Sequence, residues 1–432
     1  MAMDENKKNN KGQFLDNFAG KTNLPSADQV EKSQEEPVIS SDRKKNAPKR
    51  MKKKTPLSKL PKWVYAIIAV LLAVVLGLFI WFSVDSSSGI GQWFRSITVG
   101  SGQGDGYPTS IVGSSVNRGN FMTLDKNVVA VSDTALTVMN SSANQSINRQ
   151  HSFNSPVLRA TSGKYLIYNL GGNGFKIEGS SDTIYSGNTN NNIIAGDIAG
   201  SGRYALVTEA QGYPSSLSVY LTDNTVQYKY DFSEYYVTDI SLNSDGTRAA
   251  VSGITAKDGG IVSAVYIFDF SNPEPIAILT YNEVLMEKVE YMDNGTVAAI
   301  GDTTTSMING TTGEKVDYNY QSRQMTDYAI DKNRVALALT PYDNQSASKL
   351  VILDSSASEK CVIESQDKID AVSLYGDTAA ILTDSTITGY SASSGNSFST
   401  AEAGSDARGI ALADEATVYV LGVSQIRQAR FS

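Results

Sequence analysis

RVALALT, at residues 334–340, is one of eight similar stretches that decide the fold of this 432-residue chain. Each stretch opens with a polar residue and continues through four or five mostly apolar positions, which is the pattern of a β-strand covered on both faces. The other seven are NVVAVSD (127–133), KYLIYNL (164–170), RYALVTE (203–209), RAAVSG (248–253), TVAAIGD (296–302), TAAILTD (378–384) and TVYVLGV (417–423). The C-terminal part of the chain therefore repeats one strand-forming element.

The surroundings of these stretches repeat as well. A further strand precedes each one across a polar turn such as SDG (244–246) or DNG (293–295), and one or two more strands follow it. The units begin near residues 116, 156, 194, 237, 286, 325, 369 and 407, about 42 residues apart. Four strands every ~40–45 residues is typical of a β-propeller blade. An array of β-sandwiches is the alternative, but it does not require a common unit length.

The two ends of the repeat region predict how the ring closes. Residues 407–432 supply only three strands, whereas YPTSIVG (107–113) is a strand without a unit of its own. Pairing of 107–113 with the last unit would remove an open sheet edge. We therefore expect residues 107–432 to form an all-β propeller of eight four-stranded blades, or of seven if the second unit is irregular.

An uncharged run of 22 residues, from Trp63 to Val84, predicts one transmembrane helix. At about 1.5 Å per residue it spans ~33 Å, enough for a hydrocarbon core of ~30 Å. Residues 43–62 hold ten Lys/Arg and no acidic residue, which predicts a cytoplasmic N-terminus and an extracellular C-terminal domain. A cleaved signal peptide is disfavoured because its apolar run is usually only about 7–15 residues long. We therefore expect a single-pass signal-anchor in the cell membrane.

The segments on either side of this helix differ in charge. Residues 1–62 hold 15 Lys/Arg against 8 Asp/Glu and are predicted to be a disordered, basic cytoplasmic tail. Residues 85–106 are predicted to be a Gly/Ser-rich linker. Residues 85–432 hold 22 basic against 37 acidic residues, a net charge of −15 that disfavours nucleic acid as a partner. The basic cluster at residues 43–62 could also indicate nucleic-acid binding or nuclear targeting. Orientation of the adjacent helix and contact with anionic lipid explain it more simply.

Scarce residue types exclude several kinds of site. With one cysteine, Cys361, and one histidine, His151, the chain has no intramolecular disulfide framework and no multi-histidine zinc site. It also lacks a P-loop, a GxSxG motif and a dense Asp cluster at calcium-loop spacing. We therefore predict no catalytic, cofactor-binding or metal-binding residues, and interpret His151 and Cys361 as packing residues.

Several turns resemble those of quinoprotein-type (PQQ-like) propeller repeats. The segments are VMNSSANQSI (138–147), INGTTGEKVDY (308–318) and YSASSGNSFS (390–399). Together with the GDGYP stretch at 104–108, the basic tail and the single span, the chain also resembles membrane-anchored propeller proteins of Gram-positive bacteria, a family without an assigned function. The resemblance implies the fold. It does not imply quinoprotein redox chemistry, because all three tryptophans precede the repeats and no adjacent-cysteine pair exists.

Insertions in the turns between the second and third strands point to a candidate binding face. These turns lie at 169–174, 209–216, 254–263 and 340–348, and in a propeller they all emerge on one face. The candidate binding residues are Tyr213, Pro214, Lys257, Asp258, Pro341, Tyr342 and Asp343. Rigid aromatic side chains of this kind suit contact with a protein or a glycan. Variation in loop length without any function explains the insertions equally well at this point.

The sequence thus favours a non-enzymatic role, in which the outer domain binds or scaffolds an extracytoplasmic protein or glycan. Two alternatives stay open. A carboxylate-based enzyme acting on glycans requires acidic side chains from different units to converge around the axis, ~5–9 Å apart. A sensor would instead transmit an external binding event to the tail. The sequence identifies neither the partner nor the oligomeric state.

Overall fold

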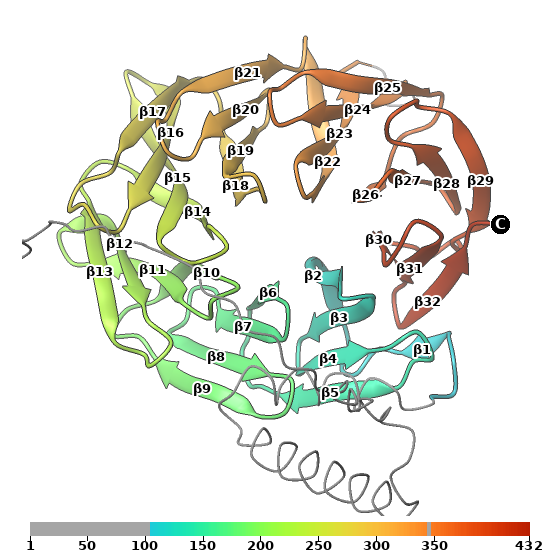
Figure 1. Cartoon of the computed structure of the whole chain (residues 1–432), viewed down its shortest axis with the longest axis horizontal. Coiled ribbons are helices and arrows are strands. Elements are labelled where there is room, and N and C mark those ends of the chain that lie inside the picture. The colour runs from blue at the N-terminus through green and yellow to red at the C-terminus, as the bar shows by residue number, and fades with distance from the viewer. Residues whose placement is uncertain (1–103, 344–346) are drawn as a thin grey trace, which may run out of the picture. The chain divides into compact units, whose positions relative to one another are not determined.

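The computed structural model describes residues 104–343 and 347–432, and these residues form an all-β, eight-bladed propeller. Each blade is an antiparallel four-stranded sheet, and Figure 1 shows the eight sheets following one another around a ring with the first strand of each innermost. The count of eight confirms the larger of the two predicted numbers. The second unit, expected to be irregular in a seven-bladed ring, forms a regular blade.

The first four blades use the strands of residues 116–282. Their bounds are β2 (Val116–Leu124), β3 (Asn127–Ser132), β4 (Ala135–Met139) and β5 (Gln145–Gln150) in blade 1; β6 (Pro156–Thr161), β7 (Lys164–Asn169), β8 (Gly174–Gly179) and β9 (Thr183–Asn188) in blade 2; β10 (Ile193–Ile198), β11 (Tyr204–Ala210), β12 (Tyr213–Tyr220) and β13 (Val226–Phe232) in blade 3; and β14 (Tyr236–Leu242), β15 (Arg248–Lys257), β16 (Gly260–Asp269) and β17 (Ala277–Asn282) in blade 4.

The last four blades complete the ring. Their bounds are β18 (Met286–Tyr291), β19 (Thr296–Gly301), β20 (Thr304–Asn309) and β21 (Lys315–Asn319) in blade 5; β22 (Arg323–Asp331), β23 (Arg334–Pro341), β24 (Ser348–Asp354) and β25 (Glu359–Ser365) in blade 6; β26 (Ala371–Tyr375), β27 (Thr378–Thr383), β28 (Thr386–Ser391) and β29 (Ser397–Glu402) in blade 7; and β30 (Gly409–Leu412), β31 (Thr417–Leu421), β32 (Gln425–Arg430) and β1 (Thr109–Ser110) in blade 8.

Blade 8 combines strands from both ends of the described region. Thr109 of β1 pairs with Ile426 of β32, so the segment that precedes blade 1 supplies the outermost strand of the last blade. The Tyr107 ring lies 5.1 Å from that of Tyr419 in β31, and the Tyr107 hydroxyl donates a 2.9 Å hydrogen bond to the carbonyl of Asn140. The ring is therefore closed by pairing of its two ends, and the short strand β1 covers the outer edge of β32 as the fourth strand of blade 8.

Burial in each blade decreases from the inside of the ring to the outside. The second strand of a blade is covered by the blades on either side, so all six residues of β3 except the first are buried. The fourth strand faces solvent, and β9 and β29 have no buried residue. The apolar core accordingly consists of clusters that each join two neighbouring blades, such as blades 3 and 4 or blades 8 and 1.

The turns between the first and second strands use the residues that their backbone angles require. In blade 4, the Asn243 side chain accepts hydrogen bonds from the amides of Thr247 and Arg248, both at 2.9 Å. Gly246 has φ +69°, and a Cβ there would lie 2.8 Å from Cβ of Arg203 in blade 3. Glycine is needed at this position because any side chain would meet both backbone strain and the neighbouring blade.

The structure leaves the predicted membrane segment undescribed. The Trp63–Val84 helix, the tail and most of the 85–106 linker lie outside the described residues, whereas Gly104 and Gly106 donate hydrogen bonds to Ser142 in the β4–β5 turn. Within residues 104–343 and 347–432, no helix is long and apolar enough to cross a membrane.

Candidate functional site

The predicted binding residues lie at one end of the blades. Because neighbouring strands run antiparallel, the start of the first strand, the turn between the second and third strands and the link to the next blade all lie at the same end. We call this end the entry face. The other two turns of each blade lie at the opposite face.

Tyr213 and Pro214 belong to a strand and not to a loop. Both open β12, and only residues 211 and 212 form the turn from β11. Tyr213 pairs with Ala210 across this turn and is 47% exposed. The expected loop insertion at 209–216 is therefore an extension of the β11–β12 hairpin.

Lys257 and Asp258 lie at the tip of another lengthened hairpin. β15 and β16 have ten residues each and pair without interruption to Lys257 and Gly260. Asp258 and Gly259 form the two-residue turn, both with positive φ, which is the geometry that such tight hairpins use. Here too the predicted loop is a longer pair of strands, because the inserted residues continue the ladder of hydrogen bonds.

The third predicted group lies apart from the other two. Pro341 ends β23 of blade 6, and Tyr342 and Asp343 follow it, with Tyr342 59% exposed. Residues 344–346 of the same turn lie outside the described residues. Blade 5 separates this group from the predicted residues on blades 3 and 4, so the seven residues do not form one cluster.

Tyr236, which is not among the predicted binding residues, joins the groups on blades 3 and 4. It begins β14, is 62% exposed and pairs with Ile254 of β15. The amide of Val237 donates a 3.1 Å hydrogen bond to Oγ of the buried Ser215, which places the start of β14 beside the start of β12. Two adjacent tyrosines at the start of a strand indicate one exposed aromatic side chain, because successive side chains of a strand point to opposite faces. Tyr235 is buried and Tyr236 is exposed.

Two aliphatic residues extend this surface. Ile261, 50% exposed, lies on β16 opposite Ala256. Leu170, 46% exposed, forms a parallel bridge with Ile193 at the start of blade 3. We call Leu170, Tyr213, Tyr236 and Ile261 the apolar arc, since they lie on the entry face of the consecutive blades 2, 3 and 4.

The charges around the apolar arc have predominantly one sign. Its six turn and link segments (169–174, 188–193, 209–214, 231–237, 256–261 and 281–287) contain a single basic residue, Lys257. They contain six acidic residues, all exposed: Glu209, Asp231, Glu234, Asp258, Glu283 and Glu287. Burial, and to a smaller extent the Glu234 carboxylate, raises the pKa of Tyr235, the buried residue that precedes Tyr236. The apolar arc thus lies in a strongly negative surrounding, with a net charge of −5.

A second group of charged residues lies on the innermost strands of the blades, toward the axis of the ring. Arg159 of β6 donates to Asp239 of β14 at 2.8 Å, and Lys288 Nζ of β18 lies 3.1 Å from the same carboxylate. Lys288 Nζ also lies 3.2 Å from Glu290. We call Arg159, Asp239, Lys288 and Glu290 the channel network; it joins blades 2, 4 and 5.

Arg118 makes a second connection across the ring. It pairs with Asp327 of β22 and donates a 2.9 Å hydrogen bond to the carbonyl of Asp370, which joins blade 1 to blade 6 and to the segment before blade 7. These blades are not neighbours of blade 1 in the ring. The charged side chains of the inner strands therefore connect blades that are not neighbours in the ring.

The inner-strand aspartates also link successive blades. Asp197 accepts a 2.7 Å hydrogen bond from the amide of Leu242, Asp239 a 3.1 Å bond from Val289, and Asp327 a 2.6 Å bond from Val372. In each case the donor is on the first strand of the next blade. This repeated contact explains why an acidic residue recurs in the first strands.

The environments of these carboxyl groups move their pKa values apart. Burial would raise the pKa of Asp239, but the Lys288 and Arg159 cations outweigh it and hold that pKa below its usual value. Burial raises the pKa of Asp197 to about 7, although the bond from Leu242 and the Arg159 charge oppose this. Burial likewise raises the pKa of Asp327 to about 6 against the effect of Arg118.

The channel carboxylates converge as the glycan-enzyme alternative requires, but cations accompany them. Lys288 Nζ is within 3.2 Å of both Asp239 and Glu290, so an ammonium group occupies the space in which a glycosidase pair would hold a sugar. Asp197 differs, because its pKa of about 7 suits a proton donor at neutral pH. Among residues 104–343 and 347–432, no group of three or more His, Cys, Asp or Glu could hold a metal ion.

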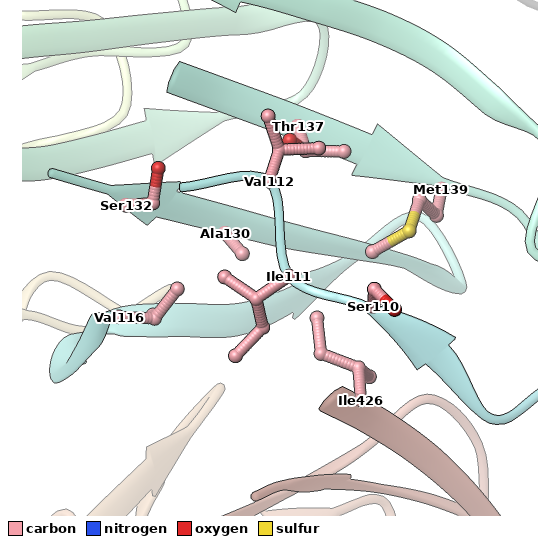
Figure 2. A pocket seen from close by; sticks show the side chains of 9 residues that line it. All are labelled: Ser110, Ile111, Val112, Val116, Ala130, Ser132, Thr137, Met139 and Ile426. Atoms are coloured by element: carbon pink, nitrogen blue, oxygen red, sulfur yellow. The ribbon is translucent and has the colours of Figure 1, made fainter. Parts of the chain in front are cut away.

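Two cavities accompany these features. One, of about 490 Å³, lies where the inner strands of blades 1, 6, 7 and 8 end, with Glu290 on its wall. The other lies at the closure between blades 8 and 1; Figure 2 shows Ile111 and Val112 among its lining side chains, together with Ile426. Its volume of about 10 Å³ holds one water molecule at most, so it is a packing defect and not a ligand site.

His151 and Cys361 have ordinary packing surroundings. His151 Nε2 lies 3.1 Å from the carbonyl of Ser132, the ring stacks on Phe153, and burial lowers the pKa of the imidazole. Cys361, in β25, donates to the carbonyl of Ala392 at 3.3 Å, and burial raises the pKa of its thiol. Neither surrounding provides the activated nucleophile or base of a catalytic site.

Solved structures similar to this propeller carry several different functions. The C-terminal WD40 domain of Sif2 has a TM-score of 0.55 and 10% identity, covering 76% of this chain and 99% of that one. Sqt1 of Chaetomium thermophilum, bound to the N-terminus of the ribosomal protein L10, has a TM-score of 0.52 and 11% identity. That match covers 76% of this chain and 100% of the Sqt1 chain. Quinohemoprotein alcohol dehydrogenase ADHIIG of Pseudomonas putida HK5 has a TM-score of 0.52 and 8% identity, and the match covers 76% of each chain. At these identities the likeness shows the fold alone.

Sequence comparison supplies the family. No curated protein has a sequence that matches this chain. A family of unknown function, DUF5711, matches residues 106–430, a span that begins just before β1 and ends with β32. The chain is therefore a member of the DUF5711 family.

Proposed function

We propose that this protein is a membrane-anchored, extracytoplasmic β-propeller that binds a protein partner at the entry face of blades 2–4. The observation that carries the proposal is the apolar arc, in which four side chains from three successive blades are each 46–62% exposed. A grouping of large exposed apolar side chains on one face is typical of protein-interaction surfaces. Leu170 and Ile261 favour a protein over a glycan, because aliphatic side chains suit apolar anchors better than sugar hydroxyls.

The fold is consistent with such a role. The similar Sqt1 propeller is bound to a segment of another protein. In this chain the cations of the inner strands already pair with carboxylates of other blades, which leaves the entry face as the better candidate for binding. The anchor and orientation rest on the uncharged Trp63–Val84 run and the basic residues that precede it.

Site-specific cross-linking tests the binding face. A photo-reactive amino acid is placed at Tyr236 in the full chain in intact membranes, and at Tyr375 in a matched variant. Tyr375 is also partly exposed, at 37%, but ends an inner strand on the opposite face. We expect a discrete cross-linked product at position 236 and none at 375. Identical products at both positions, or none at either, would contradict the proposal.

Membrane topology requires a separate test. An epitope tag fused after Ser432 is expected to bind antibody on intact cells without permeabilisation, whereas a tag before Met1 should bind only after permeabilisation. The reverse accessibility would overturn the orientation, and release of the tagged propeller into the medium would overturn the anchor.

Asp197 favours one second candidate, a carboxylate-dependent activity on a glycan. Its pKa of about 7 is the property that a general acid needs at neutral pH. If this candidate is correct, the purified protein should release reducing ends from a cell-wall glycan preparation, and Asp197→Asn should abolish the release. Absence of release by the unaltered protein removes the candidate.

A further inference from the structure

The chemistry of the entry face also indicates which kind of protein segment binds there, and this inference rests on the proposed function. We propose that the apolar arc receives a Lys/Arg-rich segment of the partner that carries one or more large apolar side chains. Such a segment would place its apolar groups against Leu170, Tyr213, Tyr236 and Ile261 and its cations near the surrounding carboxylates. Three observations carry the proposal.

The first observation is that the carboxylates around the arc have no cation of their own. Elsewhere in the propeller Asp239, Asp354 and Asp406 form ion pairs within 3.1 Å. Within the described residues, none of the six acidic residues around the arc forms a salt bridge. Glu209 and Asp231 only accept hydrogen bonds, from Asn192 at 3.0 Å and Ser216 at 2.6 Å. Their charge is therefore available to an incoming cation.

The second observation is that the acidic and apolar groups are interleaved. Glu209 precedes Ala210, which pairs with Tyr213. Glu234 lies two residues before Tyr236, and the amide of Glu283 donates a 2.8 Å hydrogen bond to the carbonyl of Ile261. Each of these apolar groups thus has a carboxylate nearby, so a bound segment must satisfy both chemistries together. A purely apolar segment would remove the carboxylates from water without offering them a cation or a hydrogen-bond donor, which is unfavourable.

The third observation is the charge of the chain itself, which disfavours other occupants. Residues 85–432 have a net charge of −15, so the entry face of a second copy would bring carboxylates against carboxylates. Anionic lipid headgroups and anionic cell-wall polymers are repelled in the same way. A basic protein segment gains from the same field, which also speeds its encounter with the face.

Fluorescence anisotropy with defined peptides tests the proposal on the full chain. The probe is a labelled peptide that alternates Lys with Trp and Leu. One comparison peptide replaces Lys by Glu, and another keeps Lys but replaces Trp and Leu by Ser. We expect binding only by the peptide that has both features, with an affinity that falls as salt rises from about 50 to 300 mM because exposed charges are screened. A peptide of residues 43–62 reports whether the chain's own basic segment is an alternative occupant, and preferential binding of it over the Trp/Leu probe would overturn the partner assignment.

Two variants of equal charge separate this site from general attraction to an acidic protein. The arc variant carries Glu209→Gln, Asp231→Asn, Glu234→Gln and Glu283→Gln. The control variant removes four exposed charges from the opposite face through Asp182→Asn, Glu274→Gln, Asp293→Asn and Glu314→Gln. The arc variant should weaken binding by about tenfold or more, since several carboxylates act together, and the control by less than about twofold. A Tyr213→Ser/Tyr236→Ser variant should weaken it by about fivefold or more.

The outcomes are distinguishable from failure of the proposed function. Equal weakening by the arc and control variants, or equal binding of the Lys and Glu peptides, would overturn the basic-segment inference. If position 236 still cross-links to a partner in that case, the binding face stands and only its chemistry is wrong. If position 236 does not cross-link and no peptide binds, both proposals fail. Unfolding of each variant in urea shows whether it has folded before its binding is compared.

Discussion

Asp239→Asn removes one negative charge from the channel network without changing the shape of the side chain. The Asp239 side chain is 5% exposed and neutralises two cations, Arg159 at 2.8 Å and Lys288 at 3.1 Å. An asparagine can still accept the hydrogen bond from the amide of Val289. After the change Lys288 retains Glu290, whereas Arg159 has no other carboxylate within salt-bridge distance among residues 104–343 and 347–432. The variant therefore isolates the cost of leaving a cation unpaired in the channel.

The size of the effect follows from burial. Removing one partner of a buried ion pair costs about 3–5 kcal/mol. Arg159 and Lys288 keep 23% and 16% exposure of their side chains, so partial access to solvent offsets part of this cost. We therefore expect the free energy of unfolding to fall by about 3 kcal/mol, at the lower end of that range.

Urea unfolding followed by far-ultraviolet circular dichroism measures this change. Asp258→Asn is the matched control, because Asp258 is exposed at a hairpin tip and asparagine tolerates its positive φ; its effect should stay within about 0.5 kcal/mol. A loss below about 1 kcal/mol for Asp239→Asn would show that solvent compensates fully for the lost partner of Arg159, and it would refute the reasoning. Adding Arg159→Met to Asp239→Asn should recover part of the loss, because the unpaired cation is then absent.

Three further predictions concern pH, ring closure and the binding face. Burial gives Asp197 a pKa of about 7 against an ordinary 3.8, so the folded protein binds a proton that the unfolded chain has lost, and stability should fall by up to ~4 kcal/mol as pH rises from about 4 to 7. Asp197→Asn should flatten this decline in urea midpoints measured from pH 4.5 to 8. The remaining dependence of stability on pH below about 6 is then due to Asp327, whose pKa is about 6. An unchanged dependence in the Asp197 variant would contradict the assignment. Tyr107→Ala should lower the free energy of unfolding by about 2–4 kcal/mol, because it removes the ring contact with Tyr419 and the hydrogen bond to Asn140. Tyr107→Phe removes only the hydrogen bond and should lower it by about 1 kcal/mol. Equal losses of stability in thermal melts would mean that the hydroxyl, and not the ring, closes the propeller. Tyr213→Ser and Tyr236→Ser should each change the free energy of unfolding by less than about 0.5 kcal/mol, since both side chains are exposed, and a larger loss in urea would assign them a structural role.

The repeat could be read from the sequence because its signals are local. Blade starts expected at 194, 237, 286 and 325 lie at Ile193, Tyr236, Met286 and Arg323 in the structure. Each blade is a meander of short hairpins, so turn residues and the apolar second strand specify it within about 40 residues. The unequal spacing of the units predicts where the insertions lie, but it does not predict their structure. At 209–216 and 254–263 they lengthen the hairpins, because inserted residues in register continue the hydrogen-bonded ladder.

The sites needed information that no local pattern carries. Arg159 and Asp239 are 80 residues apart, and Arg118 and Asp327 are 209 apart, so only the arrangement of the blades around one ring brings each pair together. Tyr213 and Tyr236 become neighbours through the packing of one blade against the next, reported by the bond from Val237 to Ser215. The sequence by itself determined the strand-turn unit and its repetition, because hairpin formation depends on neighbouring residues. The tertiary structure decided the number of blades, the paired charges of the channel and the composition of the apolar arc, because these depend on how blades distant in the sequence meet around the ring.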